Sequence, residues 1–549
     1  MADVANLALL LTAQAAARPD ALAVVVPDGR DASGERTYAR LTFAALEAKV
    51  DRLVRGLAAH GLVPGMRAVL MVRPGVDFFA LAYALLKAGV VPVLVDPGLG
   101  RAQLRQCLAE AKPEAFIGVP EAHAARIVLG WGRATVRHLV TAGRRWAWGG
   151  ATVRSLEALG AGGPPVRVET APTDTAAILF TSGSTGPAKG VVVQHRHLVA
   201  QVAMLRATYG LAPGEVDVPT FAPFALFDPA LGLTAVVPEM DFSRPARVDV
   251  AMLGELVGDW HATNVFGSPA VLTAIARDGA SDRARWSTVR RVLSAGAPVS
   301  SATLEAMHRV LDEGAEIFTP YGATECLPVA SIGSRELLGE ARGRTARGEG
   351  ICVGRPVPPN DVRIIAIDDG ALTDWADARE LGPGEIGEIT VLGPTTTEAY
   401  EARPEATRLA KIARGGRVVH RMGDVGYLDP EGRLWFCGRK SQRVALGDRT
   451  LFTAPVEEVF NAHPAVLRSA LVGVRRAGAV VPVVLVERQP GATLDDETLI
   501  AELGALGARH SATRGLGEFA VHPAFPTDVR HNAKIAREQL AAWAEARRA

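Results

Sequence analysis

A loop rich in glycine and hydroxyl side chains, residues 181–190, has the residue types that bind a polyphosphate. It reads Thr-Ser-Gly-Ser-Thr-Gly-Pro-Ala-Lys-Gly and follows an apolar run, residues 176–180, that is typical of a buried strand. Glycines let successive backbone N–H groups point into one concavity, and hydroxyl groups and a lysine add donors and positive charge. It is not a Walker loop, because Gly190 rather than a serine or threonine follows Lys189. The candidate phosphate-binding residues are Thr181, Ser182, Gly183, Ser184, Thr185, Gly186 and Lys189.

The composition disfavours several classes of partner and location. Sixty Lys and Arg residues balance 59 Asp and Glu residues, so no net field favours nucleic acid or an anionic membrane. The four cysteines are widely spaced and match no zinc pattern, which suggests a reducing, cytoplasmic setting. The most apolar window, Val76 to Val95, contains Asp77 and Lys87 and predicts a buried helix and strand. We therefore expect a cytoplasmic protein without a signal peptide or an integral membrane segment.

The elements that position the loop alternate between helix and strand. Residues 46–60 and 102–111 have helical patterns, whereas residues 67–72 and 90–95 are short apolar strands. This alternation predicts an α/β fold of mostly parallel sheets covered by helices. After about Gly348 the pattern changes to short strands with turn signals, which predicts hairpins and a small barrel. A chain of 549 residues is too long for one core, so we expect more than one domain.

Further motifs follow the loop in a fixed order. They are Ser294-Ala295-Gly296-Ala297-Pro298, Tyr321-Gly322-Ala323-Thr324-Glu325, Gly354-Arg355-Pro356, Gly387-Glu388-Ile389, Gly423-Asp424, Gly438-Arg439 and a late Lys534 in Asn532-Ala533-Lys534-Ile535. Over nearly the whole chain, this order resembles the adenylate-forming superfamily of acyl-CoA synthetases, luciferases and peptide-synthetase adenylation domains. The resemblance implies a large N-terminal domain, residues 1–439, with a small β-barrel-like part. A small, mobile C-terminal α+β domain, residues 440–549, would follow the hinge.

The resemblance also implies the substrate ATP, the metal Mg²⁺ and a role for each motif. The loop would hold the β- and γ-phosphates, Thr324 would contact phosphate, and Glu325 would help to hold Mg²⁺. Tyr321 would lie against adenine, with Gly296, Ala297 and Gly322 in the same nucleotide site. Asp424, assisted by Arg439, would accept hydrogen bonds from the ribose hydroxyls. Taken alone, Asp424 could be a turn residue, Tyr321 a core residue and Glu325 a solvated carboxylate.

Lys534 matches the family's catalytic lysine, which stabilises charge developing between the carboxylate and the α-phosphate. The family commonly has Ser-Gly before this lysine, whereas Asn532 and Ala533 stand here. Another departure lies after the hinge, in residues 441–450, where thioester-forming relatives have a loop with lysine and glycine. Ser441 occupies the usual Asp or Lys position, and Ala445 stands where a lysine is common. We therefore expect the adenylation half-reaction to be intact and the thioester-forming half-reaction to be altered.

Three segments resemble the β-lactone synthetases of bacterial long-chain olefin biosynthesis: residues 96–101, 224–228 and 530–535. This resemblance implies a 2-alkyl-3-hydroxyalkanoic acid that is adenylated and closed to a lactone by its own 3-hydroxyl group. Other enzymes of the same hydrocarbon pathway are possible partners. Two alternatives stay open: a long-chain fatty acyl-CoA or acyl-carrier ligase, and a non-catalytic nucleotide-binding protein.

The sequence identifies neither the acyl pocket nor a general base for ring closure. Phe221, Phe224 and Phe227 are candidates for the acyl site, although core packing would explain phenylalanines equally well. For His195 and His197 a structural role is at least as plausible as metal binding.

Overall fold

The computed structural model describes residues 4–96, 98–166, 169–181, 187–447, 449–476, 478–527 and 535–547. The smaller of its two large sheets has seven strands, in the order β7 (Ala151–Thr152), β6 (His138–Thr141), β5 (Ala115–Gly118), β3 (Arg67–Met71), β4 (Val91–Val95), β8 (Thr175–Thr181) and β9 (Lys189–Gln194). All pairs are parallel except β8 and β9, which run antiparallel with Thr181 opposite Lys189. The predicted phosphate loop therefore connects these two strands.

The larger sheet has 14 strands, and their pairing changes from mostly parallel to antiparallel about halfway across the sheet. Its parallel half contains β1 (Leu22–Arg30), β11 (Thr234–Val236), β10 (Val216–Pro219), β12 (Asn264–Phe266), β13 (Arg291–Leu293) and β14 (Glu316–Ala323), with β2 (Arg36–Thr42) antiparallel at the edge. Its antiparallel half contains β15 (Cys326–Gly333), β16 (Ile351–Pro356), β21 (Leu434–Arg439), β20 (Arg417–Leu428), β18 (Gly387–Leu392) and β17 (Asp361–Ile365), with β19 (Lys411–Arg414) paired to β20.

The small barrel predicted after Gly348 is not a closed one. Among the described strands, β16 pairs with β15 on one side and β21 on the other, so the antiparallel strands extend the larger sheet. The sheet order ends at β17, and no described pairing returns from it to close a ring. The short strands and turns predicted there are confirmed, and the barrel-like part stays open because β15 joins these strands to β14 of the parallel half.

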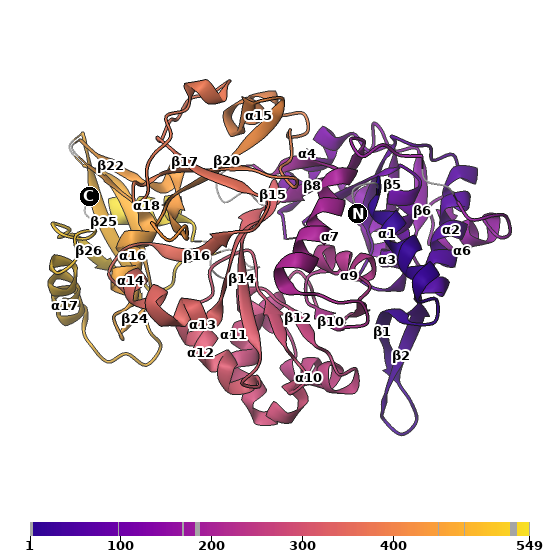
Figure 1. The fold of residues 1–549 in the computed structure, drawn as a ribbon, viewed down its shortest axis with the longest axis horizontal. Coiled ribbons are helices and arrows are strands. Elements are labelled where there is room, and N and C mark those ends of the chain that lie inside the picture. The colour runs from indigo at the N-terminus through magenta and orange to yellow at the C-terminus, as the bar shows by residue number, and fades with distance from the viewer. Residues whose placement is uncertain are drawn as a thin grey trace.

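Helices fill the space between the sheets and cover their outer faces (Figure 1). The largest apolar cluster joins both sheets through α1 (Leu7–Ala17), α2 (Phe43–Ala59), α3 (Val76–Lys87), α7 (His195–Tyr209) and α9 (Phe227–Leu231). Another cluster packs α10 (Val250–Asp259), α11 (Pro269–Asp278) and α12 (Ser301–Val310) on the other face of the larger sheet. A third places α4 (Arg101–Ala111) and α5 (Pro120–Leu129) on the smaller sheet. The helices predicted at residues 46–60 and 102–111 and the parallel strands predicted at residues 67–72 and 90–95 are confirmed.

The last part of the chain forms its own small sheets at one end of the molecule (Figure 1). A hairpin of β22 (Val444–Leu446) and β23 (Arg449–Leu451) is followed by α16 (Thr453–Asn461). A three-stranded sheet of β24 (Val466–Arg476), β25 (Ala479–Arg488) and β26 (Phe519–Val521) is joined by α17 (Asp496–Ala508) and α18 (Arg537–Ala546). The boundary at residue 440 and the mobility of this part stay predictions. None of the helices in the described ranges is long and apolar enough to cross a membrane.

Candidate active site

Asp424 and Arg439 lie opposite each other on neighbouring strands. Asp424 is on β20 and Arg439 ends β21, and the antiparallel register pairs the two residues directly. Arg439 Nη1 lies 2.7 Å from Asp424 Oδ1. From β14, the Tyr321 hydroxyl group donates a 2.6 Å hydrogen bond to Asp424 Oδ2. Three of the predicted nucleotide-binding side chains are therefore in direct contact.

The Asp424 carboxyl group is buried, with 3% of the residue exposed. Burial raises its pKa, and the neighbouring Arg439 guanidinium and Tyr321 hydroxyl groups oppose that shift by favouring the charged form. Burial and the Asp424 charge raise the pKa of Tyr321 well above its usual value, so Tyr321 stays a hydrogen-bond donor. A carboxylate has about four acceptor sites on its two oxygens, which leaves room for hydroxyl groups of a ligand.

Glu325 lies close to the end of the phosphate loop. It occupies the turn between β14 and β15 beside Thr324, and both residues are partly exposed. The Tyr400 hydroxyl group donates a 2.5 Å hydrogen bond to Glu325 Oε1. Lys189 Nζ lies 5.0 Å from the centre of the Tyr400 ring. Tyr400 therefore connects the candidate metal ligand to the lysine of the loop.

Tyr400 reaches this position because its segment runs beside β9. Tyr400 forms an isolated antiparallel bridge with Val191, and the Glu401 N–H group donates to the Gly190 carbonyl at 2.7 Å. Sequence reasoning missed Tyr400, because it stands in a polar run without apolar periodicity.

The glycines of the predicted nucleotide site lie at the carboxyl ends of β13 and β14. A Cβ atom on Gly322 would lie 2.6 Å from Leu327 Cδ1 and 2.7 Å from the Cys326 carbonyl oxygen, so only glycine fits there. Gly296 has φ = +100°, which favours glycine, and it stands beside Ala297 in the loop after β13. The carboxyl edge of a parallel sheet is where α/β folds commonly bind ligands.

Some predicted residues lie outside the described part of the chain. They are Ser182, Gly183, Ser184, Thr185, Gly186 and Lys534. Thr181 is described as the last residue of β8, without its side chain. The described residues contain no group of three or more potential metal-ligating side chains. A single carboxylate such as Glu325 still fits Mg²⁺, because this ion is usually held by one or two carboxylates together with phosphate oxygens.

The two histidines after β9 have a structural setting. Both His195 and His197 are buried, and burial lowers the pKa of each to about 4. His197 Nδ1 accepts a 3.1 Å hydrogen bond from the Gln194 N–H group at the start of α7. These contacts favour helix capping and packing over metal binding.

The three phenylalanines predicted for the acyl site gather around Phe266. The Phe224 ring stacks on Phe266 with centroids 4.0 Å apart, and Phe221 stacks at 6.0 Å. Phe227 packs edge-on against Phe224 at 5.7 Å. Acyl binding and core packing both remain compatible with this cluster.

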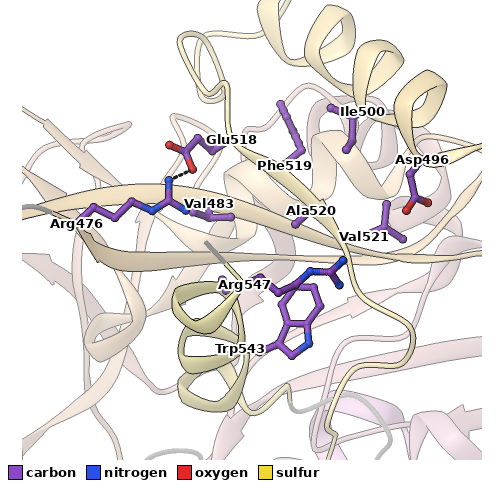
Figure 2. Close-up of a pocket in the computed structure, with 11 residues that line it drawn as sticks. Arg476, Val483, Asp496, Ile500, Glu518, Phe519, Ala520, Val521, Trp543 and Arg547 are labelled. Atoms are coloured by element: carbon purple, nitrogen blue, oxygen red, sulfur yellow. Dashed lines mark hydrogen bonds and ion pairs between the residues drawn. The ribbon is translucent and has the colours of Figure 1, made fainter. Parts of the chain in front are cut away.

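A cavity of about 240 Å³ lies in the C-terminal part, between the three-stranded sheet, α17 and α18 (Figure 2). It is lined by Arg476, Val483, Asp496, Ile500, Glu518, Phe519, Ala520, Val521, Trp543, Ala544 and Arg547. None of these residues belongs to the predicted nucleotide site.

Comparison with known proteins gives the same family that the order of the motifs indicated. A family model described as AMP-binding enzyme matches residues 11–401. An olefin beta-lactone synthetase of Stenotrophomonas maltophilia strain K279a is 52% identical over 548 residues, covering 98% of each chain. An olefin beta-lactone synthetase of Xanthomonas campestris pv. campestris is 50% identical and covers 100% of this chain and 99% of its own.

Solved structures show the same fold. The amide bond synthetase McbA from Marinactinospora thermotolerans has a TM-score of 0.78 at 24% identity, covering 98% of this chain and 99% of its own. The chain therefore belongs to the AMP-binding enzyme family, in which its full-length relatives include olefin beta-lactone synthetases.

Proposed function

We propose that the protein activates a long-chain 2-alkyl-3-hydroxyalkanoic acid with ATP and closes it to a β-lactone. A carboxylate oxygen attacks the α-phosphorus of ATP, and pyrophosphate leaves. The 3-hydroxyl oxygen of the same molecule then attacks the acyl carbon, AMP leaves, and the hydroxyl proton passes to solvent. The observation that carries this proposal is the similarity, at half of all positions and over the full length, to two olefin beta-lactone synthetases.

The site supports the adenylation step through charge and hydrogen bonds. Asp424, oriented by Arg439 and Tyr321, would accept hydrogen bonds from the ribose hydroxyl groups. Lys189 would neutralise the phosphates, and Lys534 would act on charge that develops at the reacting oxygen. Glu325, oriented by the Tyr400 hydroxyl group, would help to hold Mg²⁺. The ion would supply positive charge for the departing pyrophosphate.

The ring-closing step fits an internal nucleophile. The segment after the hinge folds as the β22–β23 hairpin, in which Ala445 pairs with Thr450 and is exposed. Ala445 carries no ammonium group, whereas relatives that admit a thiol commonly have a lysine there. A well-positioned internal nucleophile reaches an effective molarity of roughly 10⁵–10⁸ M, although ring strain offsets part of that gain.

The experiment that tests the proposal is a product analysis without any thiol. With ATP, Mg²⁺ and a long-chain 2-alkyl-3-hydroxy acid, we expect AMP, pyrophosphate and an organic product that is the acid minus water. A 3-deoxy analogue is the matched control, because it can be adenylated but lacks the nucleophile. A coenzyme A thioester whose formation strictly depends on the thiol would support an acyl-CoA ligase instead. Absence of ATP–pyrophosphate exchange with every acid would support the non-catalytic alternative.

The proposed reaction also suggests where the protein acts in the cell and with which other enzymes. We place the enzyme in the cytoplasm, where ATP is supplied, and expect it to exchange substrate and product with other enzymes of a hydrocarbon pathway.

A further inference from the structure

Lys411 is a buried lysine beside the candidate site that has no part in the proposed mechanism. It begins β19, where it pairs with His420 of β20, and only 9% of the residue is exposed. Its ammonium group donates to the Thr397 carbonyl oxygen and lies 3.3 Å from the Thr397 hydroxyl oxygen. Both partners are neutral, so these contacts do not balance its charge.

No carboxylate in the described part of the chain forms an ion pair with Lys411. Lys87, which is also buried, shows the contrast: its ammonium nitrogen lies 2.5 Å from a Glu47 carboxylate oxygen and 2.6 Å from an Asp51 carboxylate oxygen. Burial lowers the pKa of Lys411 to about 8, against the opposing field of Glu325. A buried cation without an ion pair is costly, and such groups occur where a charge is needed for function.

The surroundings of Lys411 connect it to both ends of the candidate phosphate site. Its Nζ lies 5.8 Å from the centre of the Tyr400 ring, and Lys189 Nζ lies 5.0 Å from the same centre. The Tyr400 hydroxyl group donates to Glu325, and the Thr397 N–H group donates to the Glu325 carbonyl oxygen at 2.9 Å. Lys411 therefore holds Thr397, and Thr397 and Tyr400 together hold Glu325.

We propose that Lys411 is a positioning residue of the triphosphate site, which orients Glu325 through Thr397 and Tyr400 and adds a further positive charge to that of Lys189. In this role its charge would act on the β- and γ-phosphates, which are the part of ATP that AMP lacks. The inference rests on the proposed use of ATP and is independent of what the acyl-adenylate becomes.

Nucleotide binding to the full-length protein tests this inference. Lys411→Met keeps an unbranched apolar side chain, one atom shorter, and removes the charge. We expect the Kd of Mg·ATP, measured by calorimetry, to rise about tenfold, as for removal of one unit charge from a poorly hydrated site. The Kd of AMP should stay within about twofold, because AMP has neither the terminal phosphates nor their metal. Lys112→Met, at an exposed position after α4, is the matched loss of one charge and should change neither value.

Another variant separates charge from anchoring. Lys411→Gln keeps an N–H donor directed along a similar side chain, one atom shorter, but carries no charge, so it should weaken Mg·ATP binding as Lys411→Met does. Wild-type affinity in Lys411→Gln would overturn the inference, as would equal weakening of ATP and AMP in either variant. If the wild-type protein itself did not bind Mg·ATP, the proposed function would fail instead.

Discussion

Tyr321 and Asp424 are joined by a 2.6 Å hydrogen bond, although three strands separate β14 from β20 in the larger sheet. In a flat sheet, strands four places apart lie about 19 Å from each other. A tyrosine side chain cannot cover that distance, so the sheet must curl between β14 and β20. This curl brings Tyr321, predicted to lie against adenine, into contact with Asp424, predicted to bind the ribose, without closing a barrel.

Tyr321→Phe removes this bond and leaves a buried carboxylate with one donor fewer. A hydrogen bond to a charged group contributes about 1.5–3 kcal/mol, so we expect the Kd values of ATP and AMP to rise together by about tenfold. The contact exists both before and during the reaction, so kcat for ATP–pyrophosphate exchange should change little. Calorimetry and exchange kinetics measure the two effects separately.

The matched control for that variant is Tyr427→Phe. Tyr427 lies on β20, the strand that carries Asp424, and its hydroxyl group donates to the Glu349 carbonyl oxygen at 2.9 Å rather than to Asp424. Tyr427→Phe should remove one buried tyrosine hydrogen bond, as Tyr321→Phe does, and leave the Kd values of ATP and AMP unchanged. If Tyr321→Phe binds both nucleotides normally, Asp424 does not depend on Tyr321 for its position.

The sequence predicted the parts of this site that local motifs encode. The motifs at Tyr321, Asp424 and Arg439 were predicted to share one nucleotide site, and the structure brings these three side chains together. Tyr400 and Lys411 could not be predicted in the same way. Tyr400 contacts Glu325 directly and Lys411 is connected to it through Thr397, because residues 397–401 run beside β9. Such long-range pairing leaves no periodic pattern in a short polar segment.

The sequence could not show, for a related reason, that the predicted barrel-like part does not close. Short strands and turns near Gly384 and Gly432 were visible in the sequence, but closure depends on which strand each edge pairs with. β16 pairs with β15, which in turn pairs with β14 of the parallel half, and in the β15–β16 register Ala330 and Ser331 lie opposite Pro356 and Arg355. Pairing partners are set by tertiary packing rather than by local propensity.

A pH-dependent stability is expected from a buried acid pair behind the phenylalanine cluster. Asp217 on β10 and Asp228 on α9 are 4% and 3% exposed and share a hydrogen bond, which requires a proton on one of them. Burial raises the pKa of Asp217 to about 7 from a usual value of 3.8. Between these values the folded protein keeps a proton on Asp217 that the unfolded chain releases, so the contribution of Asp217 to stability falls as the pH rises from about 4 to about 7. Burial and the charge of Asp217 also raise the pKa of Asp228 well above its usual value, so the contribution of Asp228 falls in the same direction.

Asp217→Asn should remove the part of this loss that comes from Asp217, because the amide keeps the hydrogen bond and cannot ionise. We expect the Tm of the variant to exceed that of the wild type by roughly 2–4 °C at pH 8, with the difference shrinking towards pH 5. Thermal melts across that range measure it. Asp241→Asn is a control whose effect on stability has the opposite sign. Hydrogen bonds from Ser243 lower the pKa of Asp241, so the charged Asp241 stabilises the folded protein and its loss should lower the Tm. A constant difference at all pH values would show that the Asp217 carboxyl group does not titrate in this range.

The late lysine should act on the rate and not on nucleotide affinity. Lys534 lies outside the described residues, and its role follows from its position in the motif order. Removing a group that stabilises transition-state charge typically costs about 10²–10³ in rate, so Lys534→Ala should lower kcat for ATP–pyrophosphate exchange by that factor. The Kd of Mg·ATP should be unchanged, which is the reverse of the result expected for Lys411→Met. Near-normal exchange by Lys534→Ala would mean that another cation acts at the α-phosphate, and an equal loss of ATP binding would assign Lys534 to ground-state binding instead.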